Sequence, residues 1–292
     1  MNQKLESIAA VCAAALLGII ATAVTPLQAQ DYPNKPIRVI VPFATGGMVD
    51  SSARVITDRL GARLGQQVLI ENRGGAAGNV GHDFVAKAAP DGYTLLVAFD
   101  GTMAINPHIY KKMNWDPFKD FTPVTKLNDA TLLLVAHPSF PYNNLRELIA
   151  NAKQAGRLPF GTAGTASTQH VAGELLKQRT GLDLVHVPYK GGGPAIADVV
   201  GGQLTLSYTA IAGGSSFVKA GKLKALGVSS LQRSAALPDV PTFIESGVPG
   251  FAVDSWIALF APAGTPAALI DRLARLHLRH HRLTVIGAGR LH

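Results

Sequence analysis

The sequence predicts an α/β protein made of two doubly wound lobes, and three observations predict it. Short apolar, β-branched runs alternate with amphipathic helical patterns in both halves of the chain. The order strand–helix–strand–helix–strand occurs twice, which is typical of a parallel sheet with helices on its faces. A loop rich in glycine and threonine follows the first strand of each half.

The first half begins with a β-branched run, IRVIVPF, which predicts a buried strand. An amphipathic helix follows and ends at Gly65, a residue type that favours the left-handed turn after a helix. The expected elements are a strand at 37–43, a helix at 50–64, a strand at 67–70, a helix at 82–89 and a strand at 93–99.

The second half repeats this order. Its first helix should turn Val171, Ala172, Leu175 and Leu176 towards the core and stop at Gly181. The expected elements are a strand at 158–161, a helix at 167–179, a strand at 182–188, a helix at 194–200 and a strand at 204–208.

The segments between the halves have their own signals. Asn144 and Glu147 resemble a capping box and predict a helix that continues to Gly156. Residues 131–136 read as a strand that crosses between the lobes, and residues 222–229 as the strand that crosses back.

The spacing of the loops suggests a repeat. Residues 42–47 match residues 159–164 at an offset of 117, and Gly74-Gly75 meets Gly191-Gly192 at the same offset. Two interpretations stay open at this point: a chance match of small residues, or two similar lobes.

The N-terminus predicts a secretory signal peptide, residues 1–29. Lys4 precedes an apolar run at 7–24, and Ala29 provides a small residue for cleavage; the alternative is a membrane anchor. The single cysteine, Cys12, lies inside the apolar run. A chain that starts near Gln30 therefore has no disulfide and no cysteine zinc site.

The charge does not indicate a nucleic-acid partner. The formal net charge is +8, but five arginines and no acid follow Asp271. The body has no basic stripe interleaved with aromatic residues, so no nucleic-acid surface is expected.

The two loops predict an anion site. A loop that leaves a parallel strand and opens a helix presents backbone N–H groups at the positive helix end. Thr45, Thr162, Thr165, Ser167 and Thr168 add hydroxyl donors. Asp50 would instead face a ligand amine or hydroxyl, or serve as an N-cap or first-turn residue of its helix.

Enzyme signatures are missing from the sequence. It contains no Walker-type loop, dinucleotide fingerprint, nucleophile elbow or H-E-x-x-H motif. His170 and Glu174 form one i, i+4 pair, and His82, His137 and His186 are isolated. We expect no catalytic residue, no cofactor and no metal site.

Many short motifs in one order then identify a family. The telling stretches are YPNKPIRVIVPFATGGMVDSSAR, VLIENRGGAAGNVG, AAPDGYTLL, GTAGTASTQHVAGELLKQRTG, VPYKGGGPAIADVVGGQ and LPDVPTFIESGVPGF. From about Tyr32 to Asp271 the chain resembles the Bug-type, TctC-like receptors of tripartite tricarboxylate transporters. The resemblance implies a periplasmic-binding-protein-like Venus flytrap, with lobe 1 at 30–130 plus 252–292 and lobe 2 at 131–251.

The resemblance also implies the binding residues. One jaw would be Phe43, Thr45, Gly46, Gly47 and Asp50; the other would be Gly161, Thr162, Gly164, Ser167, Thr168 and His170. An aspartate that the family usually has near the end of a later strand is missing from the segment Leu206 to Thr209, so ligand selectivity there is open. The segment Leu276 to His292 is also atypical, short and rich in Arg and His, like a frameshifted or decayed end.

Several functions follow as hypotheses. The leading one is a monomeric periplasmic solute-binding protein that captures a small organic acid and delivers it to a membrane permease. The ligand would be a di- or tricarboxylate, an aromatic acid or an amino acid. The alternatives are a receptor for a two-component sensor kinase, an inactive paralogue with a damaged C-terminus, or a hydrolase that acts from Ser167 and His170.

Overall fold

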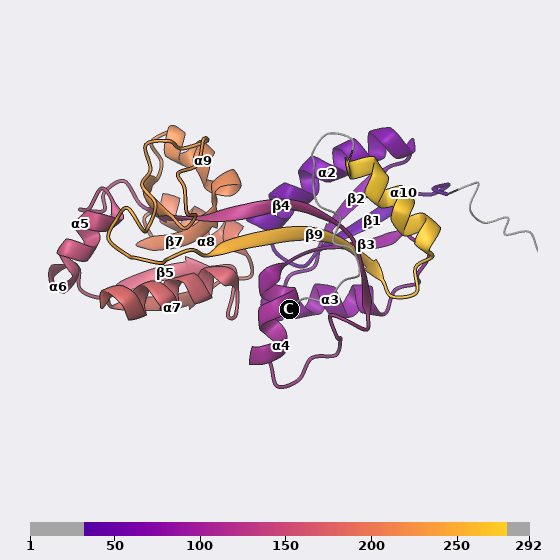
Figure 1. Cartoon of the computed structure of the whole chain (residues 1–292), viewed down its shortest axis with the longest axis horizontal. Helices are drawn as coiled ribbons and strands as arrows, with labels where there is room; N and C mark the ends of the chain where they lie inside the picture. The colour runs from indigo at the N-terminus through magenta and orange to yellow at the C-terminus, as the bar shows by residue number, and fades with distance from the viewer. Residues whose placement is uncertain (1–31, 279–292) are drawn as a thin grey trace, which may run out of the picture. The chain divides into compact units, whose positions relative to one another are not determined.

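The structure is a computed structural model, and it describes residues 32–278 (Figure 1). The predicted signal peptide with Cys12 and the tail after Leu278 lie outside the described residues. Within the described part, no helix has the length and apolar character needed to cross a bilayer. All contacts discussed below lie in the compact unit that begins at Lys35.

Within residues 32–278, nine strands form the sheet, in the order β2-β1-β3-β9-β4-β7-β5-β6, with β8 paired to β4. One group, β1 to β3, is parallel, and a second group, β5 to β7, is parallel as well. The strands are β1 (Ile37–Val41), β2 (Val68–Asn72), β3 (Thr94–Phe99), β4 (Phe121–Ala136), β5 (Leu158–Thr162), β6 (Leu184–Pro188), β7 (Leu206–Ala210), β8 (Lys224–Val228) and β9 (Asp254–Pro262).

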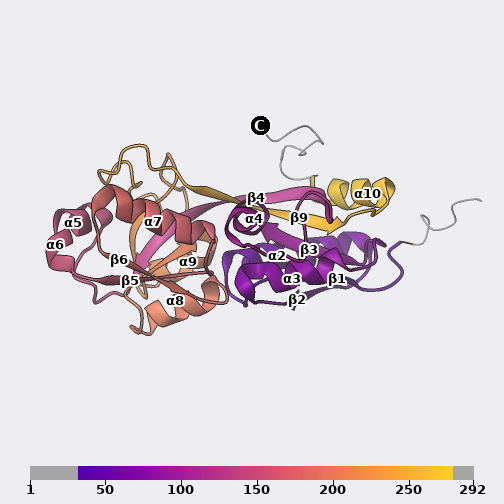
Figure 2. The same ribbon diagram turned by 90° about the horizontal axis from the view of Figure 1, so that it is seen from below.

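Helices follow the strands as in a doubly wound fold, and Figure 2 shows them distributed along both strand groups. The helices are α2 (Met48–Leu64), α3 (Asn79–Ala86), α4 (Asn106–Ile109), α5 (Leu145–Ala150), α6 (Ala152–Ala155), α7 (Thr168–Thr180), α8 (Gly192–Val200), α9 (Ile211–Lys219) and α10 (Ala267–Leu278). A 3₁₀ turn at Ala76–Gly78 and a π-helical turn at Gly101–Ile105 complete them.

Two long antiparallel strands join the groups. The first part of β4 pairs with β9, its last five residues pair with β7, and its last four also pair with β8. β9 also pairs with β3, so both strands run between the two groups (Figure 1). Each group buries its own apolar cluster, one around Leu96 and Trp115 and the other around Leu133 and Val199.

The structure confirms the two-lobed α/β class and each expected strand and helix. Most boundaries differ by a few residues, but β4 begins at Phe121, ten residues before the strand expected at 131–136. Gly65 and Gly181 end their helices in the left-handed conformation, as expected. Asn144 caps α5 by accepting the Glu147 N–H at 2.9 Å, but the helix breaks at Asn151 instead of continuing to Gly156. The predicted domain boundaries fall inside β4 and just before β9, and they stay a prediction.

Two further expectations about the fold were wrong. The segment 222–229 is not the returning crossover, because β8 pairs with β4 and stays in the second group. The return is β9, a strand buried along almost its whole length that the sequence pattern did not indicate. Val171 does not face the core either: its side chain is exposed on α7, because the buried face of this short helix is narrow and centres on Ala172 and Leu176.

Candidate functional site

The first predicted jaw is the loop 42–47, which connects the end of β1 to the start of α2. Phe43 is buried and packs edge-on against Phe99, with 5.3 Å between the ring centroids. Thr45 and Gly46 are exposed at the tip, where Gly46 has a φ of +83°. Gly47 is the N-cap of α2 and no side chain caps this helix, so its first N–H groups are left without an intrahelical partner.

Asp50 acts within its own helix turn. Its carboxylate is buried and accepts hydrogen bonds from the Gly46 N–H at 2.9 Å, from Asn72 Nδ2 at 2.9 Å and from two Arg54 nitrogens at 2.9 and 3.1 Å. Burial raises its pKa, but the hydrogen bonds from Arg54, Gly46 and Asn72 outweigh burial and leave the pKa lowered. This contact pattern fits the first-turn alternative, because the carboxylate already serves to fix the loop.

The second predicted jaw lies between β5 and α7. Gly161 and Thr162 end the strand, and Thr162 Oγ1 accepts the Gly164 N–H at 3.2 Å. Ser167 caps α7 by accepting the His170 N–H at 3.2 Å, and its hydroxyl donates to the Gly164 carbonyl at 2.7 Å. The hydroxyl groups of Thr162 and Ser167 therefore hold the loop together.

The two jaws are equivalent, but at a different offset from the one that the sequence suggested. Pro42 follows β1, whereas its sequence match Pro159 lies inside β5. In the structure Gly47 and Ser167 are the N-caps, and Gly46 and Ala166, with φ of +83° and +67°, precede them. The offset of 117 was therefore wrong for these loops. It aligns Gly164 with Gly47, but Gly47 is the N-cap of its helix, whereas Gly164 lies before the N-cap Ser167.

A third loop, which the sequence analysis did not include in the site, meets the first jaw. Lys190 accepts the Ala44 N–H through its carbonyl at 3.0 Å. A Cβ placed on Gly193 would lie 2.0 Å from the Thr45 carbonyl oxygen, and one on Gly47 would lie 3.1 Å from the Gly192 nitrogen. The run Gly191–Gly193 opens α8, which also lacks a side-chain cap. The glycine run was the available signal, since only glycine allows this close approach.

Asp100 is a second residue that the sequence analysis missed. It follows β3, and its carboxylate accepts hydrogen bonds from the Thr168 hydroxyl at 2.7 Å and from the Ser255 hydroxyl. The side chain thus links the first turn of α7 to β9 and to the end of β3. No sequence motif marks it, because its partners come from segments far apart in the chain.

The rings of His170 and His186 stack on each other beside the loop of the second jaw. The His170 and His186 rings lie 3.8 Å apart and 20° from parallel. His170 Nδ1 accepts the Ala166 N–H at 3.2 Å, and His186 Nε2 lies 2.7 Å from Thr162 Oγ1. Both rings therefore contact the loop, although His186 appeared isolated in the sequence. His170 Nε2 lies 4.0 Å from Glu174, and within residues 32–278 no group of acids, histidines or cysteines could hold a metal.

We expect the histidine pair to make the fold less stable in acid. Burial lowers the pKa of both, and burial next to His170 lowers the pKa of His186 to about 4. Since these pKa values lie below that of an unfolded histidine, about 6.5, the unfolded chain binds more protons, and stability is lost as the pH falls from about 6.5 towards 4. Melting temperatures between pH 4 and 8 should fall less in His186→Gln than in the wild type.

The matched control is His108→Gln, which changes an exposed histidine on α4. It should follow the wild-type curve. Equal acid sensitivity of the wild type and His186→Gln would contradict the assignment.

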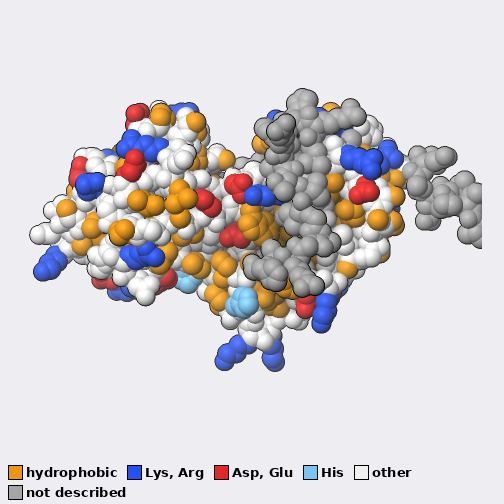
Figure 3. Space-filling view, viewed as in Figure 1, with side chains coloured by type: hydrophobic (Ala, Val, Ile, Leu, Met, Phe, Trp, Pro, Cys, Tyr) orange, Lys and Arg blue, Asp and Glu red, His pale blue; other side chains and the backbone are white. Residues whose placement is uncertain are grey.

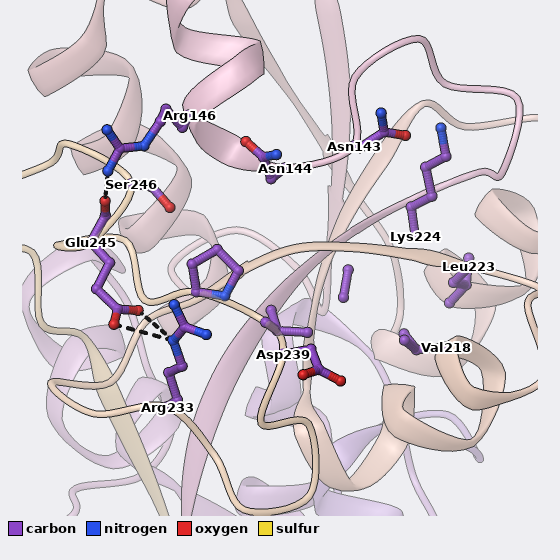
Figure 4. Close-up of a pocket in the computed structure, with 13 residues that line it drawn as sticks. Asn143, Asn144, Arg146, Val218, Leu223, Lys224, Arg233, Asp239, Glu245 and Ser246 are labelled. Atoms are coloured by element: carbon purple, nitrogen blue, oxygen red, sulfur yellow. Dashed lines mark hydrogen bonds and ion pairs between the residues drawn. The ribbon is translucent and has the colours of Figure 1, made fainter.

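A separate pocket of about 790 Å³ lies elsewhere, among the start of α5, β8 and the segment 233–246 (Figure 4). It contains none of the predicted ligand-binding residues. Arg233 donates to both carboxylate oxygens of Glu245 there, and Arg146 donates to the Glu245 carbonyl. The space-filling view shows charged side chains of both signs over this part of the surface (Figure 3).

The arrangement of two helix starts at this site suits an anion. Two helix N-termini without side-chain caps, those of α2 and α8, meet at Gly47 and Gly192. Each carries a partial positive charge and N–H groups without an intrahelical partner, which suit a carboxylate. Ser167 and His170 do not form a nucleophile and its base: the Ser167 hydroxyl donates to the Gly164 carbonyl, and His170 Nδ1 accepts the Ala166 N–H.

A family model and a curated relative match most of the chain. A family model described as "Tripartite tricarboxylate transporter family receptor" (TctC) matches residues 52–280. Protein BugT of Bordetella pertussis is 38% identical over 266 residues, which cover 89% of this chain and 82% of BugT.

Two solved structures are similar throughout. "R. palustris Rpa4515 with adipate" is 36% identical with a TM-score of 0.82, covering 85% of this chain and 83% of that one. "MatC (Rpa3494) from Rhodopseudomonas palustris with bound malate" is 37% identical with a TM-score of 0.79, covering 85% of both chains.

Proposed function

Because this chain belongs to the tripartite tricarboxylate transporter receptor family, a family of solute-binding receptors and not of enzymes, we propose that it captures a small carboxylate-bearing acid and delivers it to a membrane transporter of that type. The observation that carries the proposal is the meeting of two uncapped helix N-termini at Gly47 and Gly192. A carboxylate between them would accept backbone N–H groups and compensate two positive helix ends.

The ligand-binding residues are proposed as the two jaws and the third loop. The jaws are Phe43, Thr45, Gly46, Gly47 and Asp50, and Gly161, Thr162, Gly164, Ser167, Thr168 and His170. Within them we assign direct contact with the acid to backbone N–H groups and to the exposed tip at Thr45. Asp50, Thr162, Ser167 and His170 fix the loops through the contacts described above.

A dicarboxylate is the ligand class that we favour. The names of two similar structures report adipate and malate. Delivery to the transporter would take place in the periplasm, after removal of the predicted signal peptide.

A thermal-shift screen tests the binding step. A ligand at about 100 times its dissociation constant adds roughly 2.7 kcal/mol to the free energy of unfolding. For a chain of this size that is a shift of about 5–10 °C. We expect such a shift with at least one of succinate, malate, adipate or citrate, and none with the corresponding amides, which keep the shape of the acid but lose its charge.

Transport is tested separately. Labelled acid should enter vesicles that contain the permease subunits only when the receptor is added. Shifts of equal size with acids and amides would contradict carboxylate recognition, and receptor-independent uptake would contradict delivery.

A further inference from the structure

The Gln169 side chain carries a buried amide without a full set of hydrogen-bond partners, and it reaches from the start of α7 to the start of α2. Gln169 is the second residue of α7, and only 1% of it is exposed. Its Nε2 contacts the sulfur of Met48, the first residue of α2, at 3.3 Å. Its Oε1 is buried and has no hydrogen-bond donor in the structure. The amide oxygen of a residue from the second strand group therefore lies unpaired at the uncapped start of a helix from the first group.

An unpaired buried carbonyl oxygen is costly, because it has given up its hydrogen bonds to water. A donor that enters the site would satisfy it. A carboxylate ligand held by the neighbouring N–H groups carries no donor in its ionised carboxyl groups, so the donor must be another group of the ligand.

The surrounding charges favour a neutral donor. Asp50, on the same turn as Met48, accepts hydrogen bonds from Arg54, Asn72 and Gly46. Asp100 accepts hydrogen bonds from the hydroxyl groups of Thr168 and Ser255. Arg54 compensates the charge of Asp50, and hydroxyl and backbone N–H donors already occupy the oxygens of Asp100, so neither carboxylate is free to accept a hydrogen bond from a ligand ammonium. A hydroxyl group needs no counter-charge.

We propose that Gln169 is a specificity-determining residue, whose amide oxygen accepts a hydrogen bond from a hydroxyl group of the bound acid. The ligand class that follows is a hydroxyl-bearing dicarboxylate. This inference rests on the proposed function and adds to it the reason why a hydroxy acid is preferred over the same acid without its hydroxyl.

The test compares malate, as both enantiomers, with succinate, which differs only by the hydroxyl group, and with aspartate, which replaces the hydroxyl by an ammonium. Calorimetric titration of the purified protein should show that one malate enantiomer binds roughly 2- to 10-fold more tightly than succinate, the value of one hydrogen bond. Aspartate should not share this advantage.

Two variants separate selectivity from structure. Gln169→Leu should bring the malate-to-succinate affinity ratio to about one, because it weakens malate binding more than succinate binding. Gln178→Leu, at an exposed position of the same helix, should keep the wild-type ratio. A structural role for Gln169 would instead weaken both acids equally.

Each remaining outcome counts against the inference. A wild-type ratio of one, or an unchanged ratio in Gln169→Leu, overturns it and leaves the proposed function standing. Tighter binding of aspartate than of malate overturns the preference for a neutral donor. Failure of the wild type to bind any of these or other organic acids overturns the proposed function as well.

Discussion

Replacing Gly193 by alanine should weaken ligand binding far more than the same change at its neighbour Gly192. A Cβ on Gly193 would lie 2.0 Å from the Thr45 carbonyl oxygen and 3.0 Å from its carbonyl carbon. Both are backbone atoms of the first jaw, so the clash is relieved only when the two loops move apart. Binding between the jaws needs them together, and overpacking of this kind costs about 1–3 kcal/mol, or roughly 5- to 150-fold in affinity.

Gly192→Ala is the control because it changes the same type of residue in the same helix start. Its Cβ would meet the Gly47 Cα at 3.6 Å, an ordinary contact. We expect less than about a twofold change in its dissociation constant, and little change in its ligand-free melting temperature, since alanine suits a helix better than glycine. Equal effects of the two variants would show that the approach of the loops is irrelevant to binding.

The fold could be predicted wherever the signal is local. Alternating apolar runs and the glycine stops at Gly65 and Gly181 depend on neighbouring residues, so their elements were found. β9 was missed because a strand is defined by its partners: it pairs with β3 and β4, which lie more than a hundred residues earlier in the chain.

The site residues also divide into those with a local sequence signal and those without one. The glycine and threonine loops were visible because each is one contiguous motif. Asp100, His186 and Gln169 act through contacts with Thr168, Thr162 and Met48, and these contacts exist only after folding. The offset of 117 was misleading because a match of residue types does not show where each strand ends, and Pro159 lies within its strand.

Asp100→Ala should lower the melting temperature substantially. The carboxylate accepts hydrogen bonds from the hydroxyl groups of Thr168 and Ser255 and from the backbone N–H groups of Gly101 and Trp256. Alanine leaves these donors without an acceptor, at about 1–3 kcal/mol for a buried group, although hydroxyl groups can turn to other partners. We expect a loss of roughly 2–4 kcal/mol, or about 4–16 °C. Asp58→Ala, at an exposed position of α2, should change stability by less than about 0.5 kcal/mol.

Asp100→Asn should behave differently, and its effect should depend on pH. Burial raises the pKa of Asp100 despite its hydrogen bonds from Ser255 and Thr168. When folding raises the pKa of a carboxyl group, the resulting stabilisation is fully present at a pH below the pKa in the unfolded chain, about 3.9. It is lost as the pH rises through the pKa in the folded protein. Asparagine stays neutral throughout, so the melting temperature of the variant should improve relative to the wild type between pH 4 and pH 8.

The asparagine also keeps one acceptor oxygen, and its amide can donate to the hydroxyl groups of Thr168 and Ser255, so at pH 7 it should cost less than alanine. Melting curves of the wild type, Asp100→Asn and Asp100→Ala across this pH range decide the matter. If Asp100→Asn loses as much stability as Asp100→Ala at every pH, or if its loss relative to the wild type grows as the pH rises, the folded protein does not disfavour the charged form of Asp100. Its link between α7, β9 and the end of β3 would then depend on charge, not on hydrogen bonding alone.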